Sequence, residues 1–268
     1  MRLTLIVTTY NRPDALHAVL GSALAQRELP QQIIVADDGS DHATCSVIDQ
    51  ARAAQRADVR HVWQPHADFR AARLRNIAIA AASGDYLVIV DGDMVLHREF
   101  IADHRRIARR GHFTQGVRLL LDDERTASVL REPLQPISAS SPGLGGLRRL
   151  YALHHAPLSR ALRHLANHVI ALKSCNQGFW RDDLIRVNGF NEDFVGWGPE
   201  DKELCARLQY SGVRRQTLVC GGIAYHLKHA PAARDRFAIN TGILATTMAT
   251  RAMRCERGVD AHLTNHLP

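Results

Sequence analysis

Tyr86-Leu87-Val88-Ile89-Val90-Asp91-Gly92-Asp93 is a continuous apolar run that ends in two carboxylates separated by one glycine. An apolar run of this length, closed by turn-forming residues, is typical of a strand buried on both faces, as in a parallel sheet covered by helices. Glycine between the acids permits a tight turn, so that at least one carboxylate can reach a divalent cation. An ordinary Asp-Gly turn at the end of the strand is the alternative. The run therefore predicts a central strand that delivers acidic side chains to a site.

Strand and helix signals alternate around this run throughout the first half of the chain. Apolar runs and helical spacing predict strands at residues 3–8, 32–36, 60–63 and 86–90, and helices at 14–24, 43–56 and 71–82. The second strand ends in the polar turn Asp37-Asp38-Gly39-Ser40-Asp41. This alternation predicts an α/β fold with a mostly parallel sheet flanked by helices, which binds ligands beyond the carboxyl ends of its strands. We therefore expect one crevice to hold the carboxylates of Asp37, Asp38, Asp91 and Asp93.

The second half of the chain carries weaker signals. Prolines and serines at residues 122–142 predict a long loop. Residues 147–172 predict two helices broken at Pro157, with an apolar stripe formed by Leu158, Leu162, Leu165 and Val169. The remaining patterns predict helices at 179–187 and 202–210, a strand at 219–226 and a closing helix at 232–254.

Composition restricts the class of protein. With 268 residues, 46% of them hydrophobic and 23% charged, the chain can bury the core of one large globular domain. It has 34 Lys and Arg against 27 Asp and Glu, which favours anionic partners such as nucleotide diphosphates or lipid headgroups. Nucleic acid is disfavoured, because aromatic residues make up 6% of the chain and no known nucleic-acid-binding motif is present.

The cysteines and the apolar segments bear on the cellular compartment. The five cysteines are widely spaced and odd in number, which favours reduced thiols and a cytoplasmic protein. The apolar start at residues 1–8 is too short for a signal peptide, and no stretch reaches the roughly 18 apolar residues of a membrane span. We therefore expect a cytoplasmic protein that is soluble or lies peripherally at the inner face of the plasma membrane.

Three stretches at 7–12, 35–41 and 91–93 resemble the nucleotide-binding half of family 2 glycosyltransferases, which have the Rossmann-like GT-A fold. By that resemblance Thr9, Tyr10 and either Asp37 or Asp38 would contact the uracil or ribose of a UDP-sugar. The Asp-x-Asp motif would hold a metal on the sugar diphosphate, with Asp91 also near the nucleotide. Arg75 is similar to an arginine of the family that lies near the nucleotide, although a solvated helix face is an equal alternative for it.

Residues 188–201 contain Gly196-Trp197-Gly198-Pro199-Glu200-Asp201. This segment is similar to the Gly-Trp-Gly-x-Glu-Asp segment of β-1,4-galactosyltransferases and of bacterial polymerases that extend chondroitin-like chains. The resemblance implies that Asp201 is the catalytic base, that Glu200 contacts the acceptor or donor sugar, and that Trp197 packs against a sugar. The alternative is structural: two acids that favour a helix N-terminus, and a tryptophan of the core.

Two further positions follow from the same resemblance. Asn176, within residues 174–180, would line the acceptor side, although a turn residue is an equal interpretation. His226 would be the third metal ligand beside Asp91 and Asp93, with His229 as the second choice. A single histidine is more often structural. An imidazole among carboxylates makes Mn²⁺ the expected cofactor, with Mg²⁺ as the alternative.

The implied protein is a metal-dependent inverting glycosyltransferase that moves a hexose or N-acetylhexosamine from a UDP-sugar to a saccharide or lipid-linked saccharide of a cell-surface polysaccharide or lipopolysaccharide. One domain would span residues 1–268, divided into a nucleotide-sugar half, an inserted loop with helices, an acceptor half and a helical tail at 1–122, 123–172, 173–230 and 231–268. A nucleotidyltransferase is the first alternative, but no glycine-rich phosphate loop follows the first strand. A non-catalytic nucleotide-sugar-binding module is the second.

The basic, leucine-rich segment at residues 147–172 allows two interpretations. It can lie peripherally on an anionic membrane surface, where lipid-linked acceptors reside. It can instead pack onto the catalytic domain, which is the interpretation that we favour from the sequence.

Overall fold

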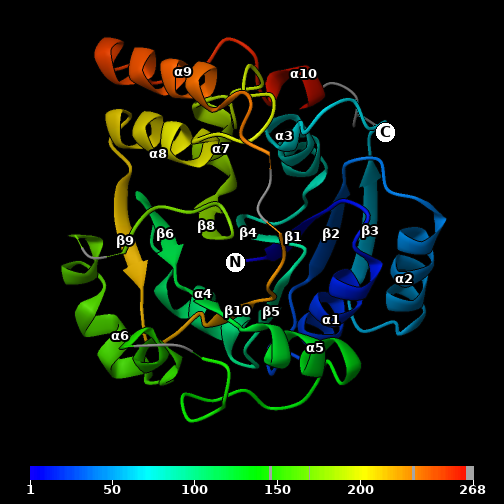
Figure 1. Cartoon of the computed structure of the whole chain (residues 1–268). Helices are drawn as coiled ribbons and strands as arrows, with labels where there is room; N and C mark the ends of the chain where they lie inside the picture. The colour runs from blue at the N-terminus through cyan, green and yellow to red at the C-terminus, as the bar shows by residue number, and fades with distance from the viewer. Residues whose placement is uncertain (145–146, 169, 231–232, 264–268) are drawn as a thin grey trace.

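The computed structural model describes residues 1–144, 147–168, 170–230 and 233–263 (Figure 1). A seven-stranded sheet in the order β3-β2-β1-β4-β8-β6-β9 forms its centre. Its strands are β1 (Leu3–Thr9), β2 (Gln32–Asp37), β3 (Asp58–Trp63), β4 (Tyr86–Asp91), β6 (His112–Gly116), β8 (Asn176–Trp180) and β9 (Arg214–Leu218). Among these strands β8 alone runs antiparallel to its neighbours, which confirms the mostly parallel sheet. A smaller sheet joins β5 (Met94–Leu96), β10 (Ala224–His226) and β7 (Arg118–Leu120).

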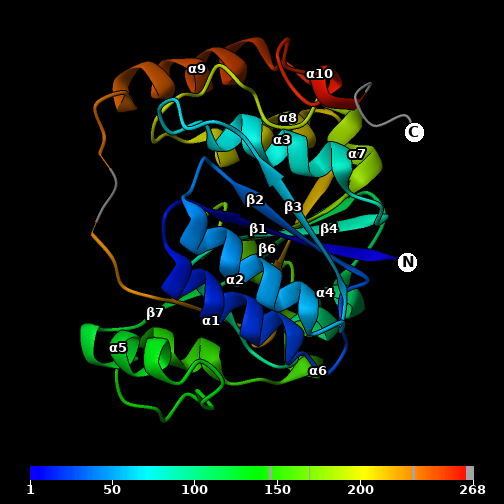
Figure 2. The same ribbon diagram turned by 90° about the vertical axis from the view of Figure 1, so that its right-hand side faces the viewer.

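Helices cover both faces of the large sheet (Figures 1 and 2). One face carries α1 (Pro13–Leu24), α2 (His42–Ala53) and α4 (Phe100–Ile107). The other carries α3 (Ala71–Ala81), α7 (Arg181–Arg186) and α8 (Glu200–Tyr210), with α9 (Phe237–Thr250) packed on α8 and α10 (Asp260–Leu263) on α3. At the end opposite α9 lie α5 (Asp123–Arg131), η1 (Leu147–Ala152), α6 (Ala156–Leu162) and η2 (Leu165–His168). This arrangement confirms the predicted α/β fold with an inserted helical segment and a C-terminal helix.

The central strands are apolar without interruption because they contribute to two cores. Successive side chains of a strand point to opposite faces of the sheet. Leu5 and Val88 accordingly belong to the core under α1 and α2, whereas Ile6 and Ile89 belong to the core under α3 and α8. All four side chains are fully buried. Because both faces of β4 are buried, the strand has a fixed position in the sheet, and the turn that follows it lies at one edge of the sheet.

Three predictions in the second half were wrong. The expected loop at 122–142 contains α5. Its N-cap residue is Asp122, whose carboxylate accepts a hydrogen bond from the Arg125 amide. The expected helix at 179–187 starts only at α7, because its first residues end the central strand β8. Of the expected strand at 219–226, only β10 is a strand.

Strands β6 and β9 were missed because their sequences are polar. Gln216 of β9 is fully buried, and its amide donates to the Thr114 hydroxyl of β6 and to the Ile107 carbonyl. A buried polar side chain that has its hydrogen bonds is tolerated in a core. An apolar pattern cannot reveal such strands.

The segment at 147–172 also differs from its prediction. Pro157 lies in the first turn of α6, where proline is favoured, and does not break a helix. Leu158 and Leu165 of the expected buried stripe are 43% and 71% exposed, while the small residues Ala152 and Ser159 are buried. Val169 of that stripe lies outside the described residues. The segment itself packs onto the domain, as favoured from the sequence, because η1 contacts β7 while α6 and η2 contact β9, but Leu158 and Leu165 remain exposed.

The expected closing helix at 232–254 is present as the shorter α9, and Ala232 itself lies outside the described residues, as do 264–268 of the predicted tail. None of the described helices has both the length and the apolar character needed to cross a bilayer. All five cysteines are free thiols.

Candidate active site

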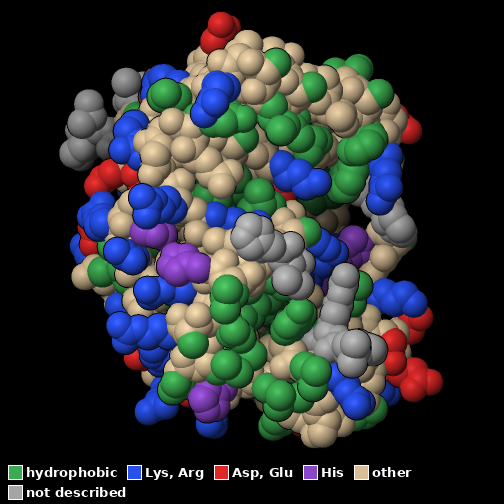
Figure 3. Space-filling model, turned by 90° about the vertical axis from the view of Figure 1, so that its left-hand side faces the viewer, with side chains coloured by type: hydrophobic (Ala, Val, Ile, Leu, Met, Phe, Trp, Pro, Cys, Tyr) green, Lys and Arg blue, Asp and Glu red, His purple; other side chains and the backbone are tan. Residues whose placement is uncertain are grey.

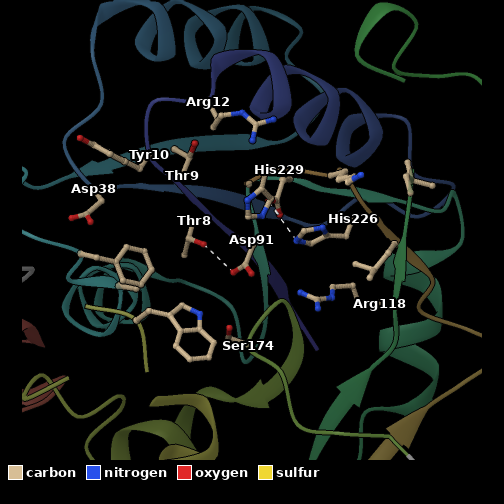
Figure 4. Close-up of a pocket in the computed structure, with 18 of the residues that line it drawn as sticks. Thr8, Thr9, Tyr10, Arg12, Asp38, Asp91, Arg118, Ser174, His226 and His229 are labelled. Atoms are coloured by element: carbon tan, nitrogen blue, oxygen red, sulfur yellow. Dashed lines mark hydrogen bonds and ion pairs between the residues drawn. The ribbon is translucent and has the colours of Figure 1, made fainter. Parts of the chain in front are cut away.

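A cavity of about 1000 Å³ opens beyond the carboxyl ends of β1 and β4. Three of the four carboxylates that were expected to share a crevice line it, namely Asp38, Asp91 and Asp93. Figure 4 shows Asp91 between Asp38 at one end of the cavity and His226 with Arg118 at the other. Of the other predicted site residues, Thr9, Tyr10, Arg75, Trp197 and Glu200 also line it.

The turn after β4 is held against β1. Thr8 of β1 lies opposite Asp91 in the parallel ladder, and its hydroxyl donates to the Asp91 carboxylate at 3.3 Å. A Cβ atom added at Gly92 would lie 2.5 Å from the Thr8 carbonyl oxygen. Glycine is therefore needed at this position by close approach of the two backbones.

We expect Gly92→Ala to lower the free energy of unfolding by about 1–3 kcal/mol, because the added methyl group forces β1 and the turn apart. Activity should fall with it, since the same turn carries both acids. Thermal unfolding and a transfer assay measure the two effects. Gly242→Ala is the matched control, because a Cβ atom at Gly242 of α9 meets no atom within 4 Å. A Gly92→Ala variant as stable and active as the control would contradict this account.

Asp93, His226 and His229 form a group that can hold a metal ion. Their potential ligand atoms lie within 4.8 Å of one another, and the Asp93 carboxylate is 3.1 Å from Nε2 of His229 and 3.6 Å from Nε2 of His226. The Leu227 amide donates to the Asp93 carbonyl, which fixes the end of β10 beside the turn. The structure thus joins Asp93 to both the first and the second choice of histidine.

The chemistry of this group fits a divalent cation. Asp93 Oδ1 and His226 Nδ1 are buried and have no hydrogen-bond partner among the described residues. Burial opposes ionisation of Asp93, but the hydrogen bond and charge of His229 together with the charge of His226 hold the pKa of Asp93 below its ordinary value. Burial lowers the pKa of His226, which favours the neutral imidazole that binds metals. One carboxylate and two imidazoles suit Mn²⁺ better than Mg²⁺.

Asp91 faces a different partner from Asp93. The buried guanidinium of Arg75 donates to Glu200 at 2.8 Å and to Asp91 at 3.4 Å. Burial opposes the charge of this arginine, and the charges of Glu200 and Asp91 overcome that effect and raise the pKa of Arg75. With only 3% of its surface exposed, Arg75 does not lie on a solvated helix face. A single side chain therefore connects the acid after β4 to the acid at the start of α8.

The Trp197 loop is positioned by glycines and by α9. The side-chain amide of Asn240 donates to the carbonyls of Val195 and Trp197, both at 3.0 Å. A Cβ atom at Gly198 would lie 2.7 Å from Asn240, which explains the glycine between Trp197 and the acids. Trp197 is half-buried and lines the cavity, so the core interpretation of this residue is wrong. The guanidinium of Arg234 lies 4.6 Å from its ring centre.

Asp201 is nearly buried beside Glu200 and is not itself a lining residue. Its carboxylate accepts a hydrogen bond from the Lys202 amide at 2.8 Å. Burial and the charge of Glu200 raise the pKa of Asp201 to about 7. An acid placed only to complement the helix dipole would have a lowered pKa, because the dipole favours the carboxylate. Burial and the charge of Glu200 therefore make this carboxyl group easier to protonate than an exposed acid at a helix N-terminus.

The structure separates Asp38 from Asp37. Asp38 lines the cavity, and burial raises its pKa. Asp37 is fully buried, and its carboxylate accepts from the Ser40 amide and lies 3.0 Å from Nε2 of His61. The end of the cavity near Asp38 also contains Tyr10, whose ring stacks on the His66 ring at 4.3 Å. Asp37 thus shapes the turn, whereas Asp38 is available to a ligand.

Asn176 does not line the cavity. It lies in β8, and its amide nitrogen donates to the carbonyls of Val117 and Gly222, while its oxygen is 3.0 Å from Nε2 of His104. Both polar atoms of the Asn176 side chain are therefore hydrogen-bonded inside the protein. Asn176 has neither the position in a turn nor the place at the acceptor side that was predicted for it. The neighbouring Ser174 lines the cavity in its place.

Several cationic residues of the cavity were not singled out from the sequence. They are Arg12, Arg118, Lys228 and Arg234. Arg118 has no carboxylate partner among the described residues, and its charge acts on Asp91 and His226. Arg12 is the last residue of the stretch at 7–12 that resembles a nucleotide-binding loop, and this position is a signal that could have identified it. Arg118 and Arg234 belong to no motif.

Residues 4–156 match the family described as glycosyl transferase family 2, and residues 158–230 match the N-terminal domain of galactosyltransferase. The chondroitin synthase of Pasteurella multocida is 27% identical over 239 residues, which cover 84% of this chain and 24% of that protein. The validoxylamine A glucosyltransferase of Streptomyces hygroscopicus subsp. limoneus is 26% identical over 225 residues, covering 79% and 48%. This chain spans about a quarter of the length of the first of these relatives.

Solved structures share the fold. S. aureus TarS 1–349 in complex with UDP superposes with a TM-score of 0.63 at 16% identity, over 99% of this chain and 70% of that one. The mannosyltransferase PcManGT from Pyrobaculum calidifontis, in complex with GDP-Man and Mn²⁺, gives 0.58 at 16% identity, over 98% and 79%. These neighbours are GT-A glycosyltransferases, which confirms the predicted fold. Because the family match at residues 4–156 covers more than half of the sequence, the chain belongs to glycosyl transferase family 2.

Proposed function

We propose that this protein is a metal-dependent inverting glycosyltransferase that moves a hexose or N-acetylhexosamine from a UDP-sugar to a saccharide acceptor of a cell-surface glycan. The observation that carries the proposal is the bridge made by Arg75, because it draws the acid of the donor side and the acid of the acceptor side to one cavity. The complexes of S. aureus TarS with UDP and UDP-GlcNAc support a uridine nucleotide. The chondroitin synthase relatives support a polysaccharide product.

The donor would lie along the cavity from Asp38 to His226. Asp38, Thr9 and Tyr10 would hold the nucleoside, because they line the end that is farthest from the histidines (Figure 4). Arg12 and Arg118 would face the diphosphate, whose negative charge complements theirs. Asp93, His226 and His229 would hold Mn²⁺, and a bound Mn²⁺ neutralises charge on the departing diphosphate.

The acceptor would enter on the side of Trp197, whose indole ring offers a platform for a sugar. Asp201 would take the proton of the attacking hydroxyl group. The acceptor oxygen then bonds to the anomeric carbon on the face opposite the diphosphate, and the bond between that carbon and the phosphate oxygen breaks with its electron pair leaving on UDP. One displacement inverts an α-linked donor to a β-glycoside. Arg75 would keep Glu200 oriented towards the sugar through their hydrogen bond.

The raised pKa of Asp201 predicts a pH profile. Only the carboxylate form accepts a proton, so below the pKa of about 7 the rate should fall about tenfold per pH unit, and above it the rate should level off. Initial rates measured between about pH 5.5 and 8.5 at saturating donor and metal test this. A rate that does not change across this interval would exclude Asp201 as the base with this pKa.

A screen of nucleotide sugars with and without Mn²⁺ tests the function as a whole, with UDP release as the readout. We expect turnover with a UDP-sugar and a saccharide acceptor only when the metal is present. Release of pyrophosphate from a nucleoside triphosphate would instead indicate the nucleotidyltransferase. Binding of UDP-sugars without turnover by any acceptor would indicate the non-catalytic module, and either result would refute the proposal.

A further inference from the structure

The exposed leucines near α6 form a surface that the proposed transfer does not use. This leucine surface consists of Leu150, Leu153, Leu158 and Leu165, which are 51%, 52%, 43% and 71% exposed. Ala152 and Ser159 of the same segment are buried. The segment therefore turns these two small residues to the protein and these four leucines to solvent, whereas an ordinary surface helix turns its leucines to the core. Exposed apolar patches of this kind mark interaction sites.

The segment that carries these leucines contains basic residues and no acids. The sequence has no Asp or Glu between Glu132 and Asp182, whereas this interval holds Arg148, Arg149, Arg160, Arg163, Lys173 and Arg181. Arg149 and Arg160 are exposed, and neither has an acidic partner among the described residues. A partner of this surface must accept both leucine side chains and unpaired positive charge.

The leucine surface also adjoins the cavity. η1, which carries Leu150, packs against β7. Leu120 at the end of β7 is 48% exposed and lines the cavity. Figure 3 shows hydrophobic side chains gathered over the lower part of the face in view, with Lys and Arg side chains along its left edge and Asp and Glu side chains at its lower right. A flat partner that covers the leucine surface would therefore lie beside the cavity.

We propose that the leucine surface docks onto an anionic lipid bilayer. Its leucines enter the boundary between headgroups and acyl chains, and Arg149 and Arg160 bind the anionic headgroups. The inference goes beyond the proposed transfer reaction and does not depend on the identity of the donor. Docking in this way sets the cavity at the bilayer surface, where a saccharide carried by a lipid can reach it.

A second apolar surface, on α9, lacks the charge for this role. Ile239 and Met248 are 58% and 55% exposed, but α9 contains no charged residue. Three of the arginines that flank it have partners within the protein: Arg234 lies over Trp197, Arg251 over Tyr210, and Arg254 pairs with Asp260. Arg236 at the N-cap is exposed and follows the exposed Asp235 in the sequence. The α9 surface therefore serves as an internal control in which the apolar helix itself carries no charge.

Vesicle flotation with the full chain tests the proposal. We expect binding to phosphatidylcholine vesicles that contain phosphatidylglycerol and little binding to phosphatidylcholine alone. The triple variant Leu150→Ser, Leu153→Ser, Leu158→Ser should bind about tenfold more weakly, because apolar area is lost from the bilayer contact. The matched control Ile239→Ser, Met248→Ser, Met253→Ser removes equally exposed side chains at the α9 end and should bind like the unmodified chain.

A second variant tests the charge separately from the leucines. Arg149→Glu with Arg160→Glu should weaken binding by about 30-fold, since each basic residue near an anionic surface contributes about 1 kcal/mol. Both variants should keep their thermal unfolding and their turnover with a soluble acceptor, so that a failure of docking is distinguished from a failure of the proposed reaction.

Several results would overturn the docking proposal. These are equal binding to neutral and anionic vesicles, full binding by the leucine variant, or loss of binding by the α9 control. A light-scattering measurement of the oligomeric state can give a further result that would overturn the proposal. If the unmodified chain is a dimer that binds no vesicles, and the leucine variant is a monomer, the surface is covered by a second copy of the chain.

Discussion

Replacing Asp201 with asparagine is expected to lower kcat by about 10²- to 10⁴-fold, the range that a positioned general base contributes. Asparagine keeps the shape of the side chain and can still accept the hydrogen bond of the Lys202 amide. It cannot take a proton from the acceptor hydroxyl. The effect should appear in kcat, while the Kd for the UDP-sugar, measured by titration calorimetry with Mn²⁺ present, should stay within about twofold.

Asp182→Asn is the matched control for this experiment. Asp182 is also a carboxylate in the first turn of a helix, but it is 78% exposed and pairs with Arg110 at the surface. Its loss should change kcat by less than about twofold, because an exposed ion pair contributes little. Near-normal turnover by Asp201→Asn, with a folded protein by circular dichroism, would remove Asp201 from the mechanism and leave Glu200 as the nearest carboxylate of the site.

Replacing Asp93 with asparagine is the second change with a large expected effect. The variant keeps the backbone bond to Leu227 but loses the charge that faces both histidines. Affinity for Mn²⁺ should fall by at least about 100-fold, and turnover by about 10³-fold, because a bound metal contributes several kcal/mol to the departure of the diphosphate. Electron paramagnetic resonance of free Mn²⁺ measures the affinity without any substrate.

The contributions of the two histidines to metal binding can be tested separately. His229 is hydrogen-bonded to Asp93, and this contact raises its pKa, so that metal binding should displace a proton from it. We expect His226→Ala and His229→Ala each to weaken Mn²⁺ binding, and Asp49→Asn, which changes an exposed acid on α2, to leave it unchanged. Mn²⁺ bound equally by Asp93→Asn and the unmodified chain would place the metal elsewhere.

Local sequence signals were sufficient for the strands and helices of residues 1–91. β1, β2 and β4 were predicted to within one residue, because a strand buried on both faces must be apolar throughout and must end at polar turn residues. The same signals did not find β6 and β9. Those strands are buried with polar side chains that bond to one another, as Gln216 does to Thr114, and the pattern of such a strand is that of a loop.

Motifs identified the acids of the site but not all of their partners. Asp91, Asp93, Trp197 and Glu200 follow from short segments whose backbone geometry is local, and the structure places each of them at the cavity. Asn176 came from the same kind of resemblance, yet its amide is used by His104, Val117 and Gly222 inside the fold. A motif identifies the types of residue at a site. Only the hydrogen bonds of the folded protein show which of their polar groups remain available to a ligand.

The sequence by itself determined strands β1, β2 and β4, the turn at Gly92 and the acidic start of α8, because these depend on the backbone preferences and burial of neighbouring residues. Only the tertiary structure decided that Arg75 joins Asp91 to Glu200, that His229 stands with His226 at Asp93, that Asp38 and not Asp37 faces the cavity, and that the leucines near α6 are exposed. The physical reason is distance along the chain. Contacts between side chains more than 100 residues apart are set by the packing of both cores at once, and no short stretch of sequence contains that information.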